Sequence, residues 1–197
     1  MTIKKACFIL ACEYKDVQFR NALVVSLCKT YSTKLKEEGI EVELIDLFDN
    51  EGKEIELTTD KILDFQSIIR SSDSVFVFHN LIWSFPPGIL KTFIDKVFIS
   101  GFAYNYYRGI FYGLLKEKKL YIYCTTELAA WQEKYIYGNI VGNFWEKVFG
   151  DRLGMTSKIK IFDSIRSRSS KEIEKWDNYL VKDLNLNKKS TNLLDLF

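Results

Sequence analysis

The chain has 197 residues, of which 47% are apolar, so it is long enough to bury one sizeable core and too apolar to be disordered as a whole. Lys and Arg number 28 and Asp and Glu 26, a formal charge of +2, and this balance gives no electrostatic reason to expect a nucleic-acid partner. No segment reaches the roughly 20 apolar residues of a membrane-spanning helix, so we expect no membrane insertion and a cytoplasmic protein.

Short apolar runs that suit buried strands alternate with longer segments that suit helices. The first run, residues 6–12, follows two lysines as in a secretory signal, but it is short and ends in charged residues, so we interpret it as a strand. The predicted strands are residues 6–12, 41–47, 75–78, 120–125 and 159–162. The predicted helices are residues 17–38, 60–70, 87–100, 139–149 and 171–184, the fourth of them stopped by Gly150.

This alternation predicts an α/β fold with a five-stranded parallel sheet and right-handed crossovers. We expect a single domain over residues 1–184 and a C-terminal tail over residues 185–197. The tail begins polar and ends apolar, so it either frays or docks on its own domain or on a partner subunit.

Cysteine and histidine usage argues against a metal site. Cys7, Cys12, Cys28 and Cys124 form no C-x-x-C pair, and His79 is the only histidine, so ligands for zinc would have to come from scattered positions. The cysteines lie in apolar runs and are expected to be buried thiols. We interpret His79, at a strand end, as a hydrogen-bonded structural residue rather than a proton donor.

The loop after the third predicted strand carries large aromatic side chains. In a parallel sheet this loop lies at the carboxyl edge, where α/β folds bind their ligands. Trp83 and Phe85 would there offer a flat apolar wall to a planar ring. Trp83 could instead be a core aromatic packed against the next helix, although the adjacent Pro86 and Pro87 make that placement awkward.

The segment around this loop resembles the flavodoxin-like NAD(P)H:quinone oxidoreductases. Their corresponding run reads roughly F-P-L-x-W-x-x-x-P-A-I-L-K, followed by G-x-F-A-Y. The residues of this chain in register with that pattern are Leu81, Trp83, Pro87, Ile89, Leu90, Lys91, Gly101, Phe102, Ala103 and Tyr104.

The resemblance implies a flavodoxin-like three-layer sandwich that binds a flavin, with NAD(P)H as co-substrate. Both FMN and FAD occur in similar folds, and the compact chain without an obvious adenosine site favours FMN. It implies ping-pong catalysis, in which nicotinamide delivers hydride to flavin N5 and a quinone or related planar electrophile takes the electrons. Similar proteins sit on the cytoplasmic domain of a transporter, so a catalytically weak ancillary or regulatory protein is the alternative. A one-electron flavodoxin carrier fits less well, because such carriers are usually strongly acidic.

The first loop would hold the flavin phosphate at a helix amino terminus. In the family it reads approximately H-P-x(3 or 4)-S-F-N-x-A-L, and this chain places Gln18, Phe19 and Arg20 at S-F-N. The histidine and proline are absent, but the Gln18 amide and the Arg20 guanidinium could supply donors. An ordinary turn with surface charges is the alternative, since Glu13 and Asp16 are anions in the same loop.

Two further loops would contact the flavin ring. The ring wall implied by the resemblance consists of Leu81, Ile82, Trp83, Ser84 and Phe85. The family's T-T-G-G loop reads Thr125, Thr126, Glu127 and Leu128 here. The threonines could face the polar edge of the ring, whereas the side chains that replace the glycines could crowd it, and a charge on Glu127 would lower the flavin potential.

Four aromatic residues are candidates for substrate contact. Trp131 and Tyr137 fall where the family carries a tyrosine and a histidine, and they either take a catalytic role or only line the pocket. In similar enzymes the residues that match Tyr104 and Tyr106 line the other subunit's pocket. We therefore expect a homodimer in which residues 101–107 reach the partner, because so apolar a segment is hard to leave exposed on a monomer.

Overall fold

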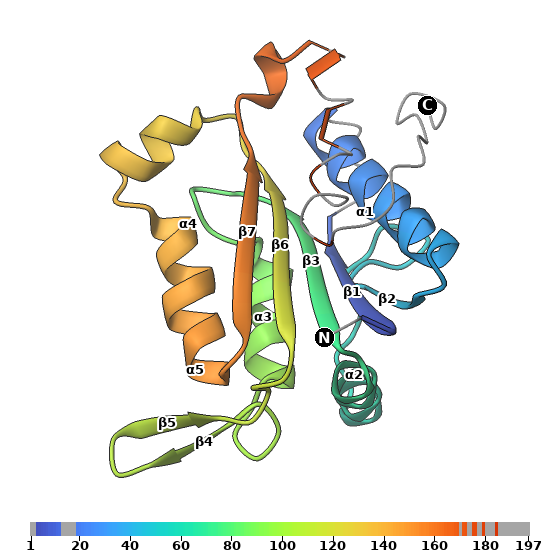
Figure 1. Cartoon of the computed structure of the whole chain (residues 1–197), viewed down its shortest axis with the longest axis vertical. Coiled ribbons are helices and arrows are strands. Elements are labelled where there is room, and N and C mark those ends of the chain that lie inside the picture. Colours follow the sequence, from blue (N-terminus) through green and yellow to red (C-terminus); the bar gives the residue numbers. More distant parts are fainter. Residues whose placement is uncertain are drawn as a thin grey trace.

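A five-stranded parallel sheet forms the centre of the molecule, with the strand order β2-β1-β3-β6-β7 (Figure 1). The computed structural model describes residues 3–12, 19–169, 171–172, 175–176, 179 and 184, with side chains from residue 23 onward in the second range. The strands are β1 (Lys5–Ala11), β2 (Glu41–Asp46), β3 (Ser74–Asn80), β6 (Lys119–Thr125) and β7 (Thr156–Phe162). The predicted α/β class and parallel sheet are confirmed.

The register of the sheet brings the carboxyl ends of its middle strands together. Ala11 at the end of β1 lies opposite His79 of β3, and Asn80 of β3 lies opposite Thr125 of β6. β3 is buried along its whole length, as expected for a central strand covered on both faces. The loops that follow β1, β3 and β6 therefore leave the sheet at one edge, which we call the carboxyl edge.

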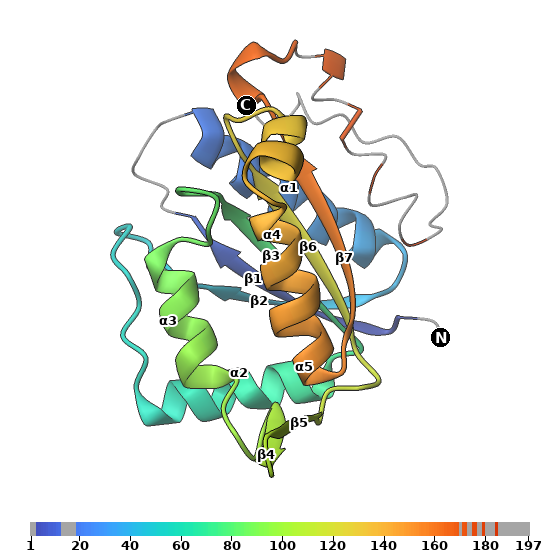
Figure 2. The same cartoon turned by 90° about the vertical axis from the view of Figure 1, so that its left-hand side faces the viewer.

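Helices cover both faces of the sheet (Figure 2). α1 (Phe19–Glu37) covers one face, and α2 (Thr59–Ser71), α3 (Gly88–Val97) and a helix over residues 140–153 cover the other. That last helix consists of α4 (Ile140–Gly142), the π-helical η2 (Asn143–Gly150) and α5 (Asp151–Leu153). A π-helical turn, η1 (Gln132–Ile136), precedes it, and a 3-10 turn, η3 (Ile165–Ser167), follows β7.

The core is divided by the sheet into two apolar layers. Under α1, aromatic side chains of the strands stack on one another, as in the pair Phe76 and Tyr121, whose ring centroids are 4.7 Å apart. Tyr31 of α1 packs into this layer and donates a hydrogen bond of 2.8 Å from its hydroxyl to the carbonyl oxygen of Trp176. Trp176 and Tyr179 lie in the predicted last helix, most of which is outside the described residues, as is the whole predicted C-terminal tail, residues 185–197.

The prediction that Gly150 ends the fourth helix is wrong. The helix continues to Leu153, and Gly154, with φ of 75°, is the left-handed residue that ends it. Gly150 has helical backbone angles, and a Cβ at this position would collide with the Ser157 hydroxyl of β7. The glycine therefore permits close packing of the helix on the sheet.

An antiparallel hairpin that we had not predicted joins α3 to β6. Its strands are β4 (Tyr104–Tyr107) and β5 (Ile110–Gly113), connected by Arg108 and Gly109 with φ of 50° and 82°. Because α3 runs back from the carboxyl edge, the hairpin lies at the opposite, amino edge of the sheet and projects below it in Figure 1.

Candidate functional site

The carboxyl edge gathers the loops after β1, β3 and β6, the loops in which the sequence predicted a ligand site. β1 and β3 are neighbours although β2 comes between them in the chain, so the strand order reverses there, and open α/β sheets bind ligands at such points. Gln18 lies outside the described residues, as do the side chains of Phe19 and Arg20, so the predicted phosphate loop stays a prediction.

Residues 82–85, which we call the Trp83 turn, present an exposed indole at this edge. Ile82 and Phe85 exchange two backbone hydrogen bonds, N–H to O, of 2.9 and 3.0 Å, and close a two-residue turn. Trp83 and Ser84 at its centre have φ of 53° and 60°, in the left-handed region that residues other than glycine rarely adopt. Trp83 is 94% exposed, which rules out the core alternative.

The other residues of the predicted ring wall divide into two groups. Ile82 and Phe85 are exposed beside Trp83 and extend its apolar surface. Leu81 is buried, and its backbone N–H donates to the Thr125 carbonyl oxygen over 2.9 Å. Leu81 therefore anchors the loop to β6 rather than presenting its side chain to a ligand.

The loop after β6 is tied to the segment that follows β7. The Thr126 N–H donates to the Phe162 carbonyl oxygen over 3.0 Å, and the Thr126 hydroxyl accepts from the Leu128 N–H over 3.2 Å. Thr125 is buried, and its hydroxyl has no hydrogen-bond partner among the described residues. This hydroxyl is a polar group of the carboxyl edge that a bound ligand could satisfy.

The two residues that replace the family's glycines adopt ordinary backbone angles. Neither Glu127 nor Leu128 has a positive φ, so the loop does not need glycine for its conformation. The Glu127 carboxylate pairs with the guanidinium of Arg166, whose Nη2 and Nε lie 2.8 and 2.9 Å from its Oε1. The predicted charge of Glu127 at the flavin edge is thus accompanied by a cation.

Residues 131–137, which we call the aromatic arm, project beyond the sheet above the loop that follows β3 (Figure 1). Trp131, Tyr135, Ile136 and Tyr137 are all exposed on it. Glu133 is the exception, because it is 1% exposed and its Oε2 accepts a hydrogen bond of 2.6 Å from the Ser84 hydroxyl. The structure thus joins two of the predicted segments through a residue that sequence reasoning missed.

His79 is completely buried behind these loops. Its Nδ1 lies 3.0 Å from the Asn80 carbonyl oxygen, which can only accept, so Nδ1 carries the proton. Burial lowers the pKa of His79 to about 4, and the ring packs against Trp145 with centroids 5.5 Å apart. His79 is thus neutral near pH 7, which agrees with the predicted structural role.

The structure does not bring the four predicted catalytic residues together in one chain. Trp131 and Tyr137 lie on the aromatic arm, at the carboxyl edge, whereas Tyr104 and Tyr106 lie on the hairpin at the amino edge. Tyr104 and Tyr106 cannot contact a ring held at Trp83 of the same molecule. Their predicted role requires the partner subunit's site.

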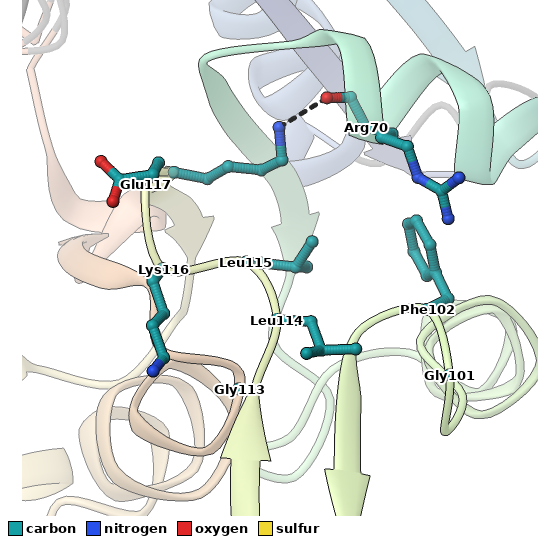
Figure 3. A pocket seen from close by; sticks show the side chains of 9 residues that line it. Arg70, Gly101, Phe102, Gly113, Leu114, Leu115, Lys116 and Glu117 are labelled. Carbon is teal, nitrogen blue, oxygen red and sulfur yellow. Dashed lines mark hydrogen bonds between the residues drawn. The ribbon is translucent and has the colours of Figure 1, made fainter.

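The amino edge has an open pocket of its own beneath the hairpin, with a volume of about 640 Å³. Figure 3 shows that Arg70, Phe102 and Leu114 point into the same space, while the side chains of Lys116 and Glu117 spread outward. The Arg70 guanidinium lies 5.4 Å from the centroid of the Phe102 ring. Lys118 donates from Nζ to the carbonyl oxygens of Arg70 and Ser72 and so caps the end of α2.

Within the described part of the chain, no three His, Cys, Asp or Glu side chains are grouped as ligands for a metal ion. All four cysteines are buried thiols, and burial raises the pKa of Cys7, Cys28 and Cys124. Among the helices that the structure describes, none combines the length and apolarity that crossing a membrane requires.

The chain belongs to a family of proteins with a flavodoxin-like fold, because the family model of that description matches residues 18–157. This confirms the predicted fold class and the family resemblance. No curated protein sequence matches the chain.

Solved structures similar to the chain extend over nearly its whole length. Smu.1420 from Streptococcus mutans UA159 is 21% identical, with a TM-score of 0.75 over 91% of this chain and 98% of that one. The NAD(P)H:quinone oxidoreductase from Methanothermobacter marburgensis is 16% identical, with a TM-score of 0.70 over 95% and 100%. An FMN-dependent NADH-azoreductase from Bacillus anthracis, solved with FMN, is 16% identical, with a TM-score of 0.67 over 93% and 100%.

The described part of the carboxyl edge fits a flavin ring. It combines an exposed indole with nearby polar atoms of Thr125, Glu133 and His79 that are buried without a hydrogen-bond partner. An isoalloxazine ring needs both a flat apolar surface and polar groups along one edge. The described residues of the amino edge include no exposed indole, and the buried hydroxyls that have no partner there, those of Ser74 and Ser157, do not adjoin one.

Proposed function

We propose that the protein is a flavin-dependent NAD(P)H oxidoreductase that reduces a quinone or a related planar electrophile, with FMN as its cofactor. The observation that carries this proposal is the Trp83 turn, a strained loop that holds a fully exposed indole at the carboxyl edge. An exposed tryptophan in an unfavourable backbone conformation suggests function rather than stability. The flavodoxin-like family and the similar oxidoreductase structures support the same proposal.

Different residues of the site would bind the ring, the polar edge and the phosphate of the flavin. Trp83, Ile82 and Phe85 would form the apolar wall for the flavin ring, with Ser84 holding their turn. Thr125 and Thr126, with the backbone at Glu127 and Leu128, would face the polar edge of the ring. Gln18, Phe19 and Arg20 would hold the phosphate at the amino terminus of α1.

A bound flavin would supply the hydride chemistry that links the nicotinamide to the acceptor. This chain contributes binding, orientation and exclusion of water. Trp131 and Tyr137, exposed on the aromatic arm, would cover the open side of the site and hold planar substrates over the ring. The Trp131 indole cannot relay a proton as a histidine would. His79 is neutral near pH 7 and completely buried, so it does not supply the proton either.

We also propose a homodimer in which the hairpin of one chain completes the site of the other. The hairpin exposes Tyr106, Tyr107, Ile110, Phe111 and Tyr112. Beside it, a groove of about 320 Å³ between α3 and the helix over residues 140–153 is lined by aromatic residues and by Lys91, Asp95 and Arg152. Lys91 and Asp95 already pair with each other, so a second copy of the chain would bury the apolar surface and supply a partner for Arg152.

The alternative is an ancillary or regulatory protein with weak catalysis, which acts on a transporter. The specific observation in its favour is that Glu127 and Leu128 replace two glycines and that Glu127 is engaged by Arg166. Such a protein could keep the flavin fold and the ring wall without turnover.

Titration of the protein with FMN and FAD tests the proposal, with flavin fluorescence and absorption as readouts. We expect FMN to bind with a micromolar or lower dissociation constant, and the loaded protein to oxidise NADH or NADPH when a quinone is present. Binding without turnover would favour the ancillary alternative. A well-folded protein that binds neither flavin below millimolar concentration would remove the oxidoreductase proposal.

A further inference from the structure

Glu133 is a buried carboxylate whose environment stability alone does not explain. It is 1% exposed, yet the ion pairs found among the described residues do not include it. Its Oε2 accepts from the Ser84 hydroxyl, and its Oε1 has no hydrogen-bond partner in the described part of the chain. A carboxylate that loses water without a counter-ion destabilises the fold. Fold stability therefore does not explain a carboxylate at this position, and its contact with Ser84 suggests a role in the site.

Among the described residues, the only side chain that donates to Glu133 belongs to the strained part of the Trp83 turn. Ser84 has φ of 60°, and the hydroxyl that reaches Glu133 over 2.6 Å stands on this left-handed backbone. Two consecutive left-handed residues other than glycine are unfavourable, so the surrounding structure must hold them. A hydrogen bond from a hydroxyl to a carboxylate is among the strong ones available for this purpose.

Glu133 also belongs to the aromatic arm, so the contact links the two walls of the site. Its backbone N–H donates to the Ala129 carbonyl oxygen, and its own carbonyl oxygen accepts from the Asn139 N–H over 2.9 Å. The arm is thus anchored at both ends around this residue. The side chains on either side of it, at residues 131, 132, 134 and 135, are not buried.

We infer that Glu133 is a positioning residue, a clasp that holds Ser84 and thereby fixes the exposed indole of Trp83 relative to the aromatic arm. The hydrogen bond between Ser84 and Glu133 thus holds Trp83 in its exposed position in the protein without a ligand. The inference deepens the proposed function, on which its ligand-binding part rests, but the state of the turn is a property of the protein alone.

Hydrogen exchange of the protein without flavin tests the clasp. The Phe85 and Ile82 amides close the turn, so their exchange reports whether it is formed. We expect Glu133→Ala and Ser84→Ala each to accelerate their exchange at least tenfold. Glu133→Gln keeps an oxygen that accepts from Ser84 and should exchange as the wild type does.

Two further variants separate the hydrogen bond from backbone strain and from general damage. Ser84→Gly also removes the hydroxyl, but glycine adopts φ of 60° without strain, so its turn should be protected better than that of Ser84→Ala. Glu146→Ala removes a carboxylate from η2, outside the turn and the arm, and should leave both amides unchanged. The amides of β1 and β3 report whether each variant is folded. If Glu133→Ala fails to fold, Ser84→Ala removes the same hydrogen bond with a smaller change.

Titration of the same variants with FMN tests the consequence for binding. We expect Glu133→Ala and Ser84→Ala to raise the FMN dissociation constant at least tenfold, and Glu133→Gln to bind FMN as the wild type does. The melting temperatures of the three variants should not follow this order. Turn amides that exchange at the wild-type rate in both alanine variants would overturn the clasp, whether or not FMN binds. If the turn loosens in them but the wild type binds no FMN, the clasp holds and the proposed function fails.

Discussion

The two edges of the sheet both expose aromatic side chains, but the surroundings of their charged groups differ. At the carboxyl edge, Glu133 and Thr125 are buried with oxygens that have no partner among the described residues, and Trp83 stands on a strained turn. At the amino edge, Lys118 caps the end of α2, and the Asp73 carboxylate accepts from the N–H groups of Lys4 and Lys5 over 2.7 and 2.9 Å.

This difference indicates what each edge is built to meet. Buried polar atoms without partners, next to an apolar wall, suit a small ligand that brings its own donors and acceptors. Charged groups that already have partners, at the same edge as an exposed aromatic hairpin, suit another protein surface, and a second copy is the simplest one.

The largest effect is expected at the hairpin. Tyr106 and Phe111 face each other across it with ring centroids 4.9 Å apart, and both are exposed. If they are buried by a second copy, Tyr106→Ser with Phe111→Ser should remove about 4 kcal/mol from association, or roughly a thousandfold in the dissociation constant. Sedimentation over a concentration series measures this loss.

Leu63→Ser is the matched control for the hairpin variant. Leu63 is an exposed apolar residue of α2, away from the hairpin, and its replacement should leave the association unchanged. FMN affinity should be unchanged in Leu63→Ser, whereas the hairpin variant should bind FMN more weakly, because it removes the partner's hairpin from the site. A wild-type protein that sediments as a monomer at micromolar concentration would refute the dimer.

The two edges should also lose stability in different pH ranges. Burial lowers the pKa of His79 to about 4 from an ordinary 6.5, so between these values the unfolded chain binds the proton that the folded chain refuses. The free energy of unfolding should therefore fall by about 3 kcal/mol between pH 7 and pH 4 because of His79 alone. Urea denaturation should show this fall in the wild type relative to His79→Gln.

Asp73 provides the comparison at the amino edge. The backbone hydrogen bonds from Lys4 and Lys5 lower the pKa of its carboxyl below the ordinary 3.8. Its stabilisation is present above that ordinary value and is lost as the pH falls through the lowered pKa. The free energy of unfolding of Asp73→Asn should therefore still fall by about 3 kcal/mol between pH 7 and pH 4, as in the wild type. If that loss persists in His79→Gln instead, His79 is not its source.

Much of this arrangement could be predicted from the sequence, and the rest depended on contacts that no local pattern records. The apolar runs identified the three central strands β1, β3 and β6, because strands buried on both faces are apolar nearly throughout. The edge strands β2 and β7 carry charged residues and were identified by their place in the alternation of strands and helices. The hairpin was missed although Arg108-Gly109 between two aromatic runs is a recognisable two-residue turn. Glu133 could not be found, because nothing in its neighbourhood in the sequence indicates that Ser84 lies beside it.

A moderate effect is expected from the ring wall. Trp83→Ala should raise the FMN dissociation constant about 10- to 100-fold, which corresponds to losing the burial of one aromatic side chain. Trp83→Phe keeps a flat ring and should lose less. Because stacking is not an ion pair, the loss should be the same in 50 mM and in 500 mM salt, as fluorescence titration can measure.

Arg20→Ala gives the contrasting result within the same site. If Arg20 pairs with the flavin phosphate, its loss should weaken FMN binding by about 1 to 3 kcal/mol, and less at high salt. Equal salt dependence in the Trp83 and Arg20 variants would contradict this division of the cofactor between an apolar wall and a charged loop.

The smallest effect on stability, and the finest test of the carboxyl edge, comes from Glu127 and Arg166. The Arg166 side chain is 71% exposed and that of Glu127 39%, so breaking their ion pair should change the free energy of unfolding by less than about 1 kcal/mol. Their charges nevertheless lie in the loops that would face the polar edge of the flavin, where reduction adds negative charge. Glu127→Gln leaves the cation alone and should raise the flavin reduction potential, whereas Arg166→Gln leaves the anion and should lower it. Potentiometric titration measures the reduction potential of each variant. The double variant should have a potential near that of the wild type. Shifts of the same sign would show that the ring does not approach this pair.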